Sequence, residues 1–142
     1  MGAVSVNDIV ITPLKRIEVP GGDVLHALKI NDPGYQGFGE SYFSHIQKDM
    51  IKAWKRHLKM TLNLVVPVGL VQFVFKDDKG GTLDIRVGPE EYSRLSVPPG
   101  LWFGFRGHHA PHSLIMNIAS IPHDPNEIER KALNEINYDW SK

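Results

Sequence analysis

Short apolar or alternating runs, separated by glycine and proline, recur along the whole of this chain. The 142 residues include 13 glycines and 10 prolines, and most of these lie between the runs, as in the PGG at 20–22 and the KGG at 79–81. Runs of this length with turn residues between them are typical of the strands of a sandwich or barrel. The sequence therefore predicts an all-β fold, with strands expected at 4–11, 15–19, 24–30, 39–46, 51–57, 61–66, 70–75, 82–87, 92–97, 101–105 and 114–119.

Composition limits the partners and the chemistry of the chain. Its length fits a single domain spanning residues 1–142, since no repeat or linker interrupts it. Lys and Arg number 16 and so do Asp and Glu, so no net field would draw the chain to nucleic acid or to a membrane surface. The absence of cysteine excludes disulfides, thiolate metal ligands and a cysteine nucleophile. No apolar run is long enough to span a bilayer, and a cytoplasmic location is the expectation.

Residues 51–75, IKAWKRHLKMTLNLVVPVGLVQFVF, join ionisable side chains to a strand-like pattern. On an extended strand Lys55 and His57 project from the same face, while Trp54 and Arg56 project from the other. The segment predicts a hairpin that turns at Pro67-Val68-Gly69. Lys55 and His57 either face solvent or line a pocket, where His57 would shuttle a proton and a desolvated Lys55 would act as base or cation.

The C-terminal segment predicts a short helix. Asp124 is suited to be the N-cap, Pro125 fits the first helical position, and Glu127 completes a capping-box spacing. Glu127 and Lys131 are then spaced as a favourable surface pair. We expect the apolar stripe to cover the sheet of its own chain, with dimerisation as the alternative; the stripe comprises Ile128, Ala132, Leu133 and Ile136.

Aromatic and cationic side chains suited to a planar or phosphorylated ligand follow residue 100. Leu101, Phe103 and Phe105 alternate with Trp102, Gly104 and Arg106, so one set is expected in the core and the other facing a cavity or water. Arg106 is a candidate for gripping a phosphate, and Trp102 for stacking on a base or sugar.

Histidines gather in the last third of the chain, which raises the possibility of a metal site. They are His108, His109, His112 and His123. Zinc and iron sites use three or four histidine or carboxylate ligands on rigid elements, whereas three of these histidines lie in a predicted loop. We therefore expect no bound metal, and no cofactor is expected.

Four phrases of the sequence resemble the short members of the dTDP-4-dehydrorhamnose 3,5-epimerase family, in the cupin superfamily. They are GFGESYFSHI (37–46), IKAWKRHLKMTLNLVVPVG (51–69), SVPPGLWFGFRG (96–107) and NIASIPHDP (117–125). The resemblance extends over roughly residues 20–125. It implies a β-jelly roll, a homodimer, and a nucleotide-linked 4-keto-6-deoxysugar bound inside one end of the barrel.

The sequence departs from that family at the residues that move protons. The family's strand motif places Lys55 where the base histidine stands, and Lys52 where a substrate-binding arginine stands. The region that supplies the family's acidic tyrosine corresponds to residues 120–122, which contain no tyrosine. Lys55-Arg56-His57 also resembles the His-X-His of the sugar 3,4-ketoisomerases with its first histidine replaced, which would leave His57 as the proton carrier.

These observations predict an enzyme that isomerises or epimerises a nucleotide-linked keto-deoxysugar. His57 and Lys55 are its expected catalytic residues. The residues expected to bind substrate are Lys52, Asn63, Tyr42, Trp102 and Arg106. A 3,4-ketoisomerase and a catalytically inactive cupin that binds a sugar nucleotide are the alternatives.

Overall fold

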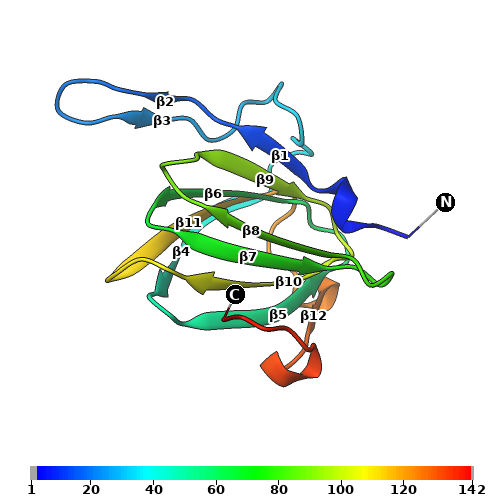
Figure 1. Ribbon diagram of the computed structural model, residues 1–142. Helices are drawn as coiled ribbons and strands as arrows, with labels where there is room; N and C mark the ends of the chain where they lie inside the picture. Colours follow the sequence, from blue (N-terminus) through cyan, green and yellow to red (C-terminus); the bar gives the residue numbers. More distant parts are fainter. Residues whose placement is uncertain (1–2, 142) are drawn as a thin grey trace.

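Two antiparallel sheets of five strands each, packed face to face, form the body of the computed structural model, which describes residues 3–141 (Figure 1). The first sheet has the order β1-β9-β6-β11-β4, and the second the order β12-β5-β10-β7-β8. The first sheet comprises β1 Val10–Pro13, β4 Glu40–Gln47, β6 Leu62–Val68, β9 Ser93–Val97 and β11 His112–Ala119. The second comprises β5 Ile51–His57, β7 Val71–Lys76, β8 Thr82–Val87, β10 Trp102–Gly107 and β12 Ile128–Arg130. The prediction of an all-β jelly-roll fold is confirmed.

The remaining elements are short. A two-stranded hairpin, β2 Arg16–Ile17 with β3 Val24–Leu25, extends away from the sheets (Figure 1). The described residues also form three single turns of 3₁₀ helix, η1 Val6–Asp8, η2 Pro125–Glu127 and η3 Leu133–Glu135. Within residues 3–141, no helix combines the length and the apolar character that crossing a membrane requires.

From β4 to β7, successive strands alternate between the two sheets, so the hairpin predicted for residues 51–75 is wrong. β5 and β7 belong to the second sheet, whereas β6 between them belongs to the first. β6 and β7 are buried along nearly their whole length, so each needs neighbours on both edges, which an isolated hairpin cannot supply. Gly69, with φ +95°, makes the crossing, and a Cβ there would lie 2.2 Å from the hydroxyl of Ser113.

The predicted C-terminal helix is also wrong, although its first turn forms as expected. The Asp124 carboxylate accepts a hydrogen bond from the Asn126 N–H, and Pro125 begins the turn. The turn ends at Glu127, and residues 128–130 then pair with β5. The edge of β5 offers unsatisfied backbone groups, so strand pairing replaces helical hydrogen bonds there. Glu127 is consequently buried, rather than paired with Lys131 on a surface helix.

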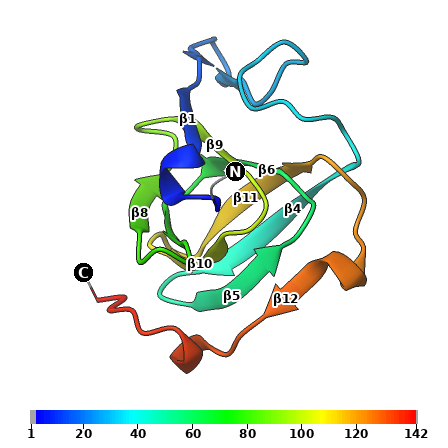
Figure 2. The same ribbon diagram turned by 90° about the vertical axis from the view of Figure 1, so that its right-hand side faces the viewer.

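The chain beyond β12 wraps across the outer face of the second sheet (Figure 2). The Trp54 indole N–H donates to the Leu133 carbonyl at 3.1 Å. Trp140 and Tyr138 pack against Trp54 in an outer aromatic cluster that also contains Trp102 and Val74. A separate core fills the space between the two sheets and includes Phe73, Phe75, Leu95 and Leu101.

Candidate active site

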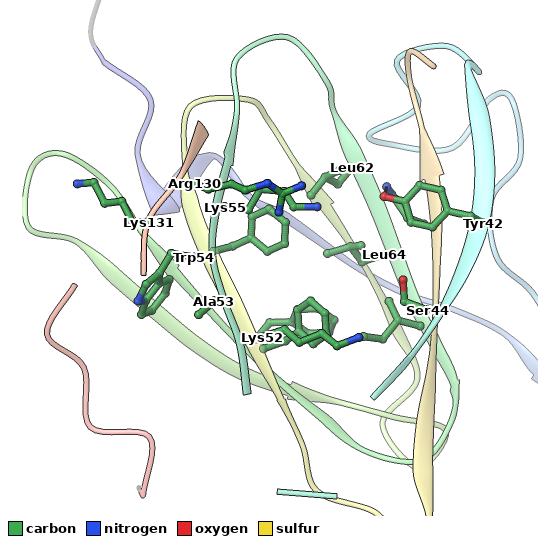
Figure 3. Close-up of a pocket in the computed structure, with 15 residues that line it drawn as sticks. Tyr42, Ser44, Lys52, Ala53, Trp54, Lys55, Leu62, Leu64, Arg130 and Lys131 are labelled. Carbon is green, nitrogen blue, oxygen red and sulfur yellow. Dashed lines mark hydrogen bonds between the residues drawn. The ribbon is translucent and has the colours of Figure 1, made fainter. Parts of the chain in front are cut away.

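A cavity of about 460 Å³ opens between the two sheets (Figure 3). Its apolar surface comes from both sheets and includes Leu62, Leu64, Phe73, Phe103, Phe105 and Ile115. Three cationic side chains line it as well: Lys52 and Lys55 of β5 and Arg130 of β12. Lys131, just beyond, also contributes to the wall, but its ammonium lies over the Trp102 ring on the outer face. None of the described residues that line it is a carboxylate. An apolar cavity with an excess of positive charge suits an anionic ligand that also has an apolar or sugar-like part.

A β-bulge places Lys52 and Lys55 on the same face of β5. Phe105 of β10 lies opposite Lys52 and Phe103 lies opposite Lys55, with a register shift between them at Gly104. One residue of β10 therefore spans two residues of β5, which brings two side chains three positions apart to the cavity. A Cβ at Gly104 would lie 2.4 Å from the Ala53 Cβ, so the bulge requires glycine there.

His57 lies beside this cavity, held by a buried carboxylate. Its Nδ1 is 2.5 Å from Oε1 of Glu127, and its ring is stacked 6.1 Å from that of Phe103, which lines the cavity. The other Glu127 oxygen accepts the backbone N–H groups of Leu58, Lys59 and Met60 at 3.1, 3.1 and 3.3 Å. His57 is only 4% exposed, and its Nε2 is buried without a hydrogen-bond partner among the described residues.

The electrostatics of this pair favour a neutral imidazole facing a carboxylate. Burial lowers the pKa of His57 below its ordinary value, and this outweighs the opposing effect of Glu127. Burial raises the pKa of Glu127, but the hydrogen bonds from His57 and from the backbone amides of Lys59 and Met60 outweigh it, so that pKa is lowered. A carboxylate can only accept, so Nδ1 carries the proton. Nε2 is therefore left unprotonated, with a lone pair that no group of the described residues uses.

The pKa of Lys55 is also below its ordinary value. Burial is the main cause, and the positive charges of Arg130 and Lys52 add to it, while Glu127 opposes them. Figure 3 shows the ends of the Lys55 and Arg130 side chains close together at the cavity. A lysine in this environment gives up its proton more readily than one in water.

Tyr42 lies on the other wall, which β4 and β11 form. Its hydroxyl accepts a hydrogen bond from the Asn117 side-chain amide at 3.1 Å, so its own proton is free to be donated. Figure 3 shows Tyr42 across the cavity from Lys55, with its hydroxyl turned inward. The two walls thus present proton-carrying groups to the same space from opposite sides.

Comparison with known proteins identifies the family. No protein-family model matches the chain, and no curated protein matches it. The structure of a dTDP sugar isomerase from Desulfovibrio desulfuricans G20 superposes with a TM-score of 0.90 at 35% identity, over 96% of this chain and 92% of that one. This chain belongs to the dTDP-4-dehydrorhamnose 3,5-epimerase-like family of dTDP-sugar isomerases.

Two more distant structures share the same fold. A sugar 3,4-ketoisomerase from Thermoanaerobacterium thermosaccharolyticum, solved in complex with TDP, gives a TM-score of 0.77 at 16% identity, over 89% of this chain and 90% of that one. A dTDP-4-dehydrorhamnose 3,5-epimerase from Sulfolobus tokodaii gives 0.79 at 18% identity, over 92% and 80%. A variant of the ketoisomerase was solved with TDP-4-keto-6-deoxyglucose.

The structure of this dTDP-sugar isomerase family member brings together some of the residues expected at the site. Lys52, Lys55 and Tyr42 line the cavity, and His57 lies beside it on the strand that carries Lys55. Lys55 lines the cavity and His57 is buried next to it, while the Trp54 ring packs in the outer aromatic cluster.

Three other expected residues do not line the cavity. Asn63 donates to the Gly34 carbonyl at 3.1 Å and accepts from the Ser96 hydroxyl at 2.5 Å, on the far face of β6. Trp102 lies in the outer aromatic cluster. Arg106 donates to the Trp140 carbonyl at 2.8 Å and to Asp49 at 3.0 Å. Trp102 and Arg106 are turned away from the cavity because β10 turns Phe103 and Phe105 inward, and Asn63 is turned away because β6 turns Leu62 and Leu64 inward.

Sequence reasoning missed residues that the structure brings to the site. Glu127, Arg130 and Lys131 were expected on a helix. In the structure Glu127 ends a single 3₁₀ turn, Arg130 belongs to β12 and Lys131 follows it, a placement that the good N-terminal capping signal did not indicate. Ser44 and Asn117 also line the cavity. Both had a usable signal: Ser44 follows Tyr42 by two positions on one strand face, and Asn117 is a polar residue within an otherwise apolar strand.

Proposed function

We propose that this protein isomerises a dTDP-linked 4-keto-6-deoxyhexose by removing a proton from the carbon next to the ketone. The observation that carries the proposal is the neutral His57, oriented by Glu127 with its Nε2 unpartnered, beside a cationic cavity. A buried histidine–carboxylate pair is a common arrangement for a general base. Family membership supports the substrate class, because the similar protein from Desulfovibrio desulfuricans is a dTDP sugar isomerase.

The proton leaves to one wall of the cavity and returns from the other. His57 Nε2 takes the proton next to the ketone, and the negative charge that develops on the ketone oxygen is stabilised by the positive charges of the cavity. The Tyr42 hydroxyl, which faces the cavity from β4, donates a proton from the opposite side. A donor on each face is what inversion at a carbon requires.

Cations that are not needed for proton transfer would hold the diphosphate. Arg130 presents a planar guanidinium to the cavity, which suits bidentate contacts with phosphate oxygens. Lys52 reaches across to β4, where its ammonium donates to the His45 carbonyl at 3.0 Å. Lys52 keeps the phosphate-binding role expected from the sequence, and Arg130 takes the role expected of Arg106.

A homodimer is the proposed assembly, supported by exposed apolar side chains on the projecting β2–β3 hairpin. Ile17, Val19 and Val24 are 43%, 43% and 51% exposed. Apolar groups gathered on an extended hairpin are typical of a surface that another chain covers. Sedimentation velocity would test this: a dimer is expected, and an Ile17→Ser/Val24→Ser variant should dissociate, whereas a monomeric wild-type protein would contradict it.

A 3,4-ketoisomerase is the second candidate, and the arrangement around His57 favours it. His57 corresponds to the second histidine of the ketoisomerase motif and keeps a buried carboxylate partner, whereas the first histidine is Lys55. Both reactions begin by removing the same proton, so they differ in the carbon that receives a proton afterwards. Product analysis separates a keto sugar whose carbonyl has moved from an epimer.

Hydrogen exchange in deuterated water tests the proposal as a whole. Incubation with dTDP-4-keto-6-deoxyglucose should incorporate deuterium at carbons adjacent to the ketone, measured by NMR of the sugar. A Tyr42→Phe variant should keep the first exchange but slow the formation of product. Binding of the sugar nucleotide without any exchange would contradict the proposal and support a catalytically inactive binding protein.

A further inference from the structure

Lys52 and Lys55 both reach the cavity but differ in their partners. The Lys52 ammonium donates to the His45 carbonyl at 3.0 Å. The Lys55 side chain makes no hydrogen bond or ion pair with any part of residues 3–141, and it lies among apolar rings and other cations. Its partner across the sheet is Phe103, and Arg130 lies opposite it on β12. Lys55 is thus a partly buried amine that the fold does not neutralise with a carboxylate.

We propose that Lys55 forms a Schiff base with the ketone of the sugar, so that the reaction proceeds through an enamine. This inference rests on the proposed function, because that function supplies the ketone. It gives the amine a chemical role that differs from that of the imidazole usual at this position.

Groups at the cavity, together with solvent, can supply and accept every proton that Schiff-base formation requires. The amine nitrogen bonds to the carbonyl carbon and passes a proton to the oxygen, giving a carbinolamine. The hydroxyl then takes a further proton, from Tyr42 or solvent, and leaves as water, giving a protonated imine. His57 Nε2 removes the adjacent proton to give the enamine. Reprotonation restores the imine, and water releases the ketone and the amine.

The surroundings of Lys55 favour this chemistry over a purely electrostatic role. A nucleophilic amine must be uncharged, and the lowered pKa that burial and Arg130 impose on Lys55 supports this. Apolar walls such as Phe103 and Phe105 limit the water that would hydrolyse an imine. An electrostatic role could be filled by any fixed cation, including an arginine, whereas a Schiff base needs the primary amine.

Reductive trapping tests the inference. The protein is incubated with dTDP-4-keto-6-deoxyglucose and sodium cyanoborohydride, and the adduct is located by intact mass and peptide mapping. A single adduct on Lys55 is expected, absent from Lys55→Arg and present in Lys48→Arg, which alters an exposed lysine outside the cavity while keeping its charge. An adduct spread over surface lysines, or one that persists in Lys55→Arg, would overturn the inference.

A second measurement detects the Schiff base even if the imine does not accumulate enough to be trapped. With a heavy-oxygen label on the ketone, a Schiff-base pathway must lose the label to water faster than buffer alone, and Lys55→Arg must lose this acceleration. Deuterium exchange without an adduct and without label loss would overturn the Schiff base while leaving the proposed function standing. Label loss without deuterium exchange would support the Schiff base and contradict the proposed function. If neither label loss nor deuterium exchange occurred, both the Schiff base and the proposed function would be contradicted.

Discussion

The two faces of β5 and β10 carry the same kinds of side chain and use them differently. On the outer face, Arg56 and Lys131 lie over the Trp102 ring at 4.6 and 4.7 Å, and Arg56 also pairs with Glu129 at 2.6 Å. On the inner face, Lys55 lies beside aromatic rings, and no carboxylate among residues 3–141 is paired to it. Cations with aromatics therefore do not define a binding site by themselves. The absence of neutralising partners distinguishes the face on which we place the chemistry.

Replacing His57 should produce the largest effect on activity. His57→Asn keeps a polar group against Glu127 but removes the proton acceptor, so the rate of deuterium exchange should fall by about 10²- to 10⁴-fold. Thermal unfolding of the variant would serve as the control for folding. If deuterium exchange continued at the wild-type rate in a folded variant, His57 could not be the base.

Removing the indole ring of Trp102, on the outer face, should affect stability instead of activity. Trp102 is buried in the outer aromatic cluster, so Trp102→Ala should lower the unfolding free energy by about 3–5 kcal/mol. Denaturant unfolding measures this loss. At a temperature where the variant is folded, its affinity for the nucleotide sugar should be unchanged, and a selective loss of affinity would return Trp102 to the site.

The sequence predicted most of the strands of the two sheets, β12 excepted, but not which face of each strand is inward. Alternation correctly put Lys55 and His57 on one side, yet it could not show that Lys52 joins them, because that requires the bulge at Gly104. For residues 101–106 both alternating sets contain aromatic residues, so alternation left the choice of inner face open.

The C-terminal segment shows a different limit. Its cap formed as the local sequence indicated, but continuation of the helix depended on a distant competitor, the open edge of β5. Glu127 could not be recognised as the partner of His57, because 70 residues separate them. Local patterns specify turns and strands, whereas the assembly of this site depends on pairing between remote segments.

Lowering the pH should decrease the unfolding free energy through the buried pair of His57 and Glu127. The pKa of His57 is lowered by burial, so the unfolded chain binds a proton more readily, and stability should fall as pH drops below the ordinary histidine value of 6.5. Glu127, whose pKa is also lowered, adds a further loss below its ordinary value of 4.5. Unfolding free energies across this range measure both. A His57→Asn variant should lose only part of this first decrease, because burial also lowers the pKa of His108. An unchanged profile in the variant would contradict the electrostatic account.

Replacing an arginine on each face should produce the smallest effects. The outer-face replacement should change stability, and the inner-face replacement should change substrate binding. Arg56→Gln removes an exposed ion pair and should lower the unfolding free energy by about 1 kcal/mol or less, with kinetics unchanged. Arg130→Gln should instead raise KM for the nucleotide sugar with little change in stability. Steady-state kinetics measures KM and denaturant titration measures the unfolding free energy of each variant. If the two variants changed the same quantity, the proposed difference between the two faces would be contradicted.

The central claim is that His57 is a neutral base, protonated at Nδ1 toward Glu127 and open at Nε2. Imidazole nitrogen NMR of the labelled protein tests it most directly. At neutral pH the account predicts a protonated Nδ1, an unprotonated Nε2, and a titration below pH 6.5. An imidazolium at neutral pH, or a proton resident on Nε2, would contradict it.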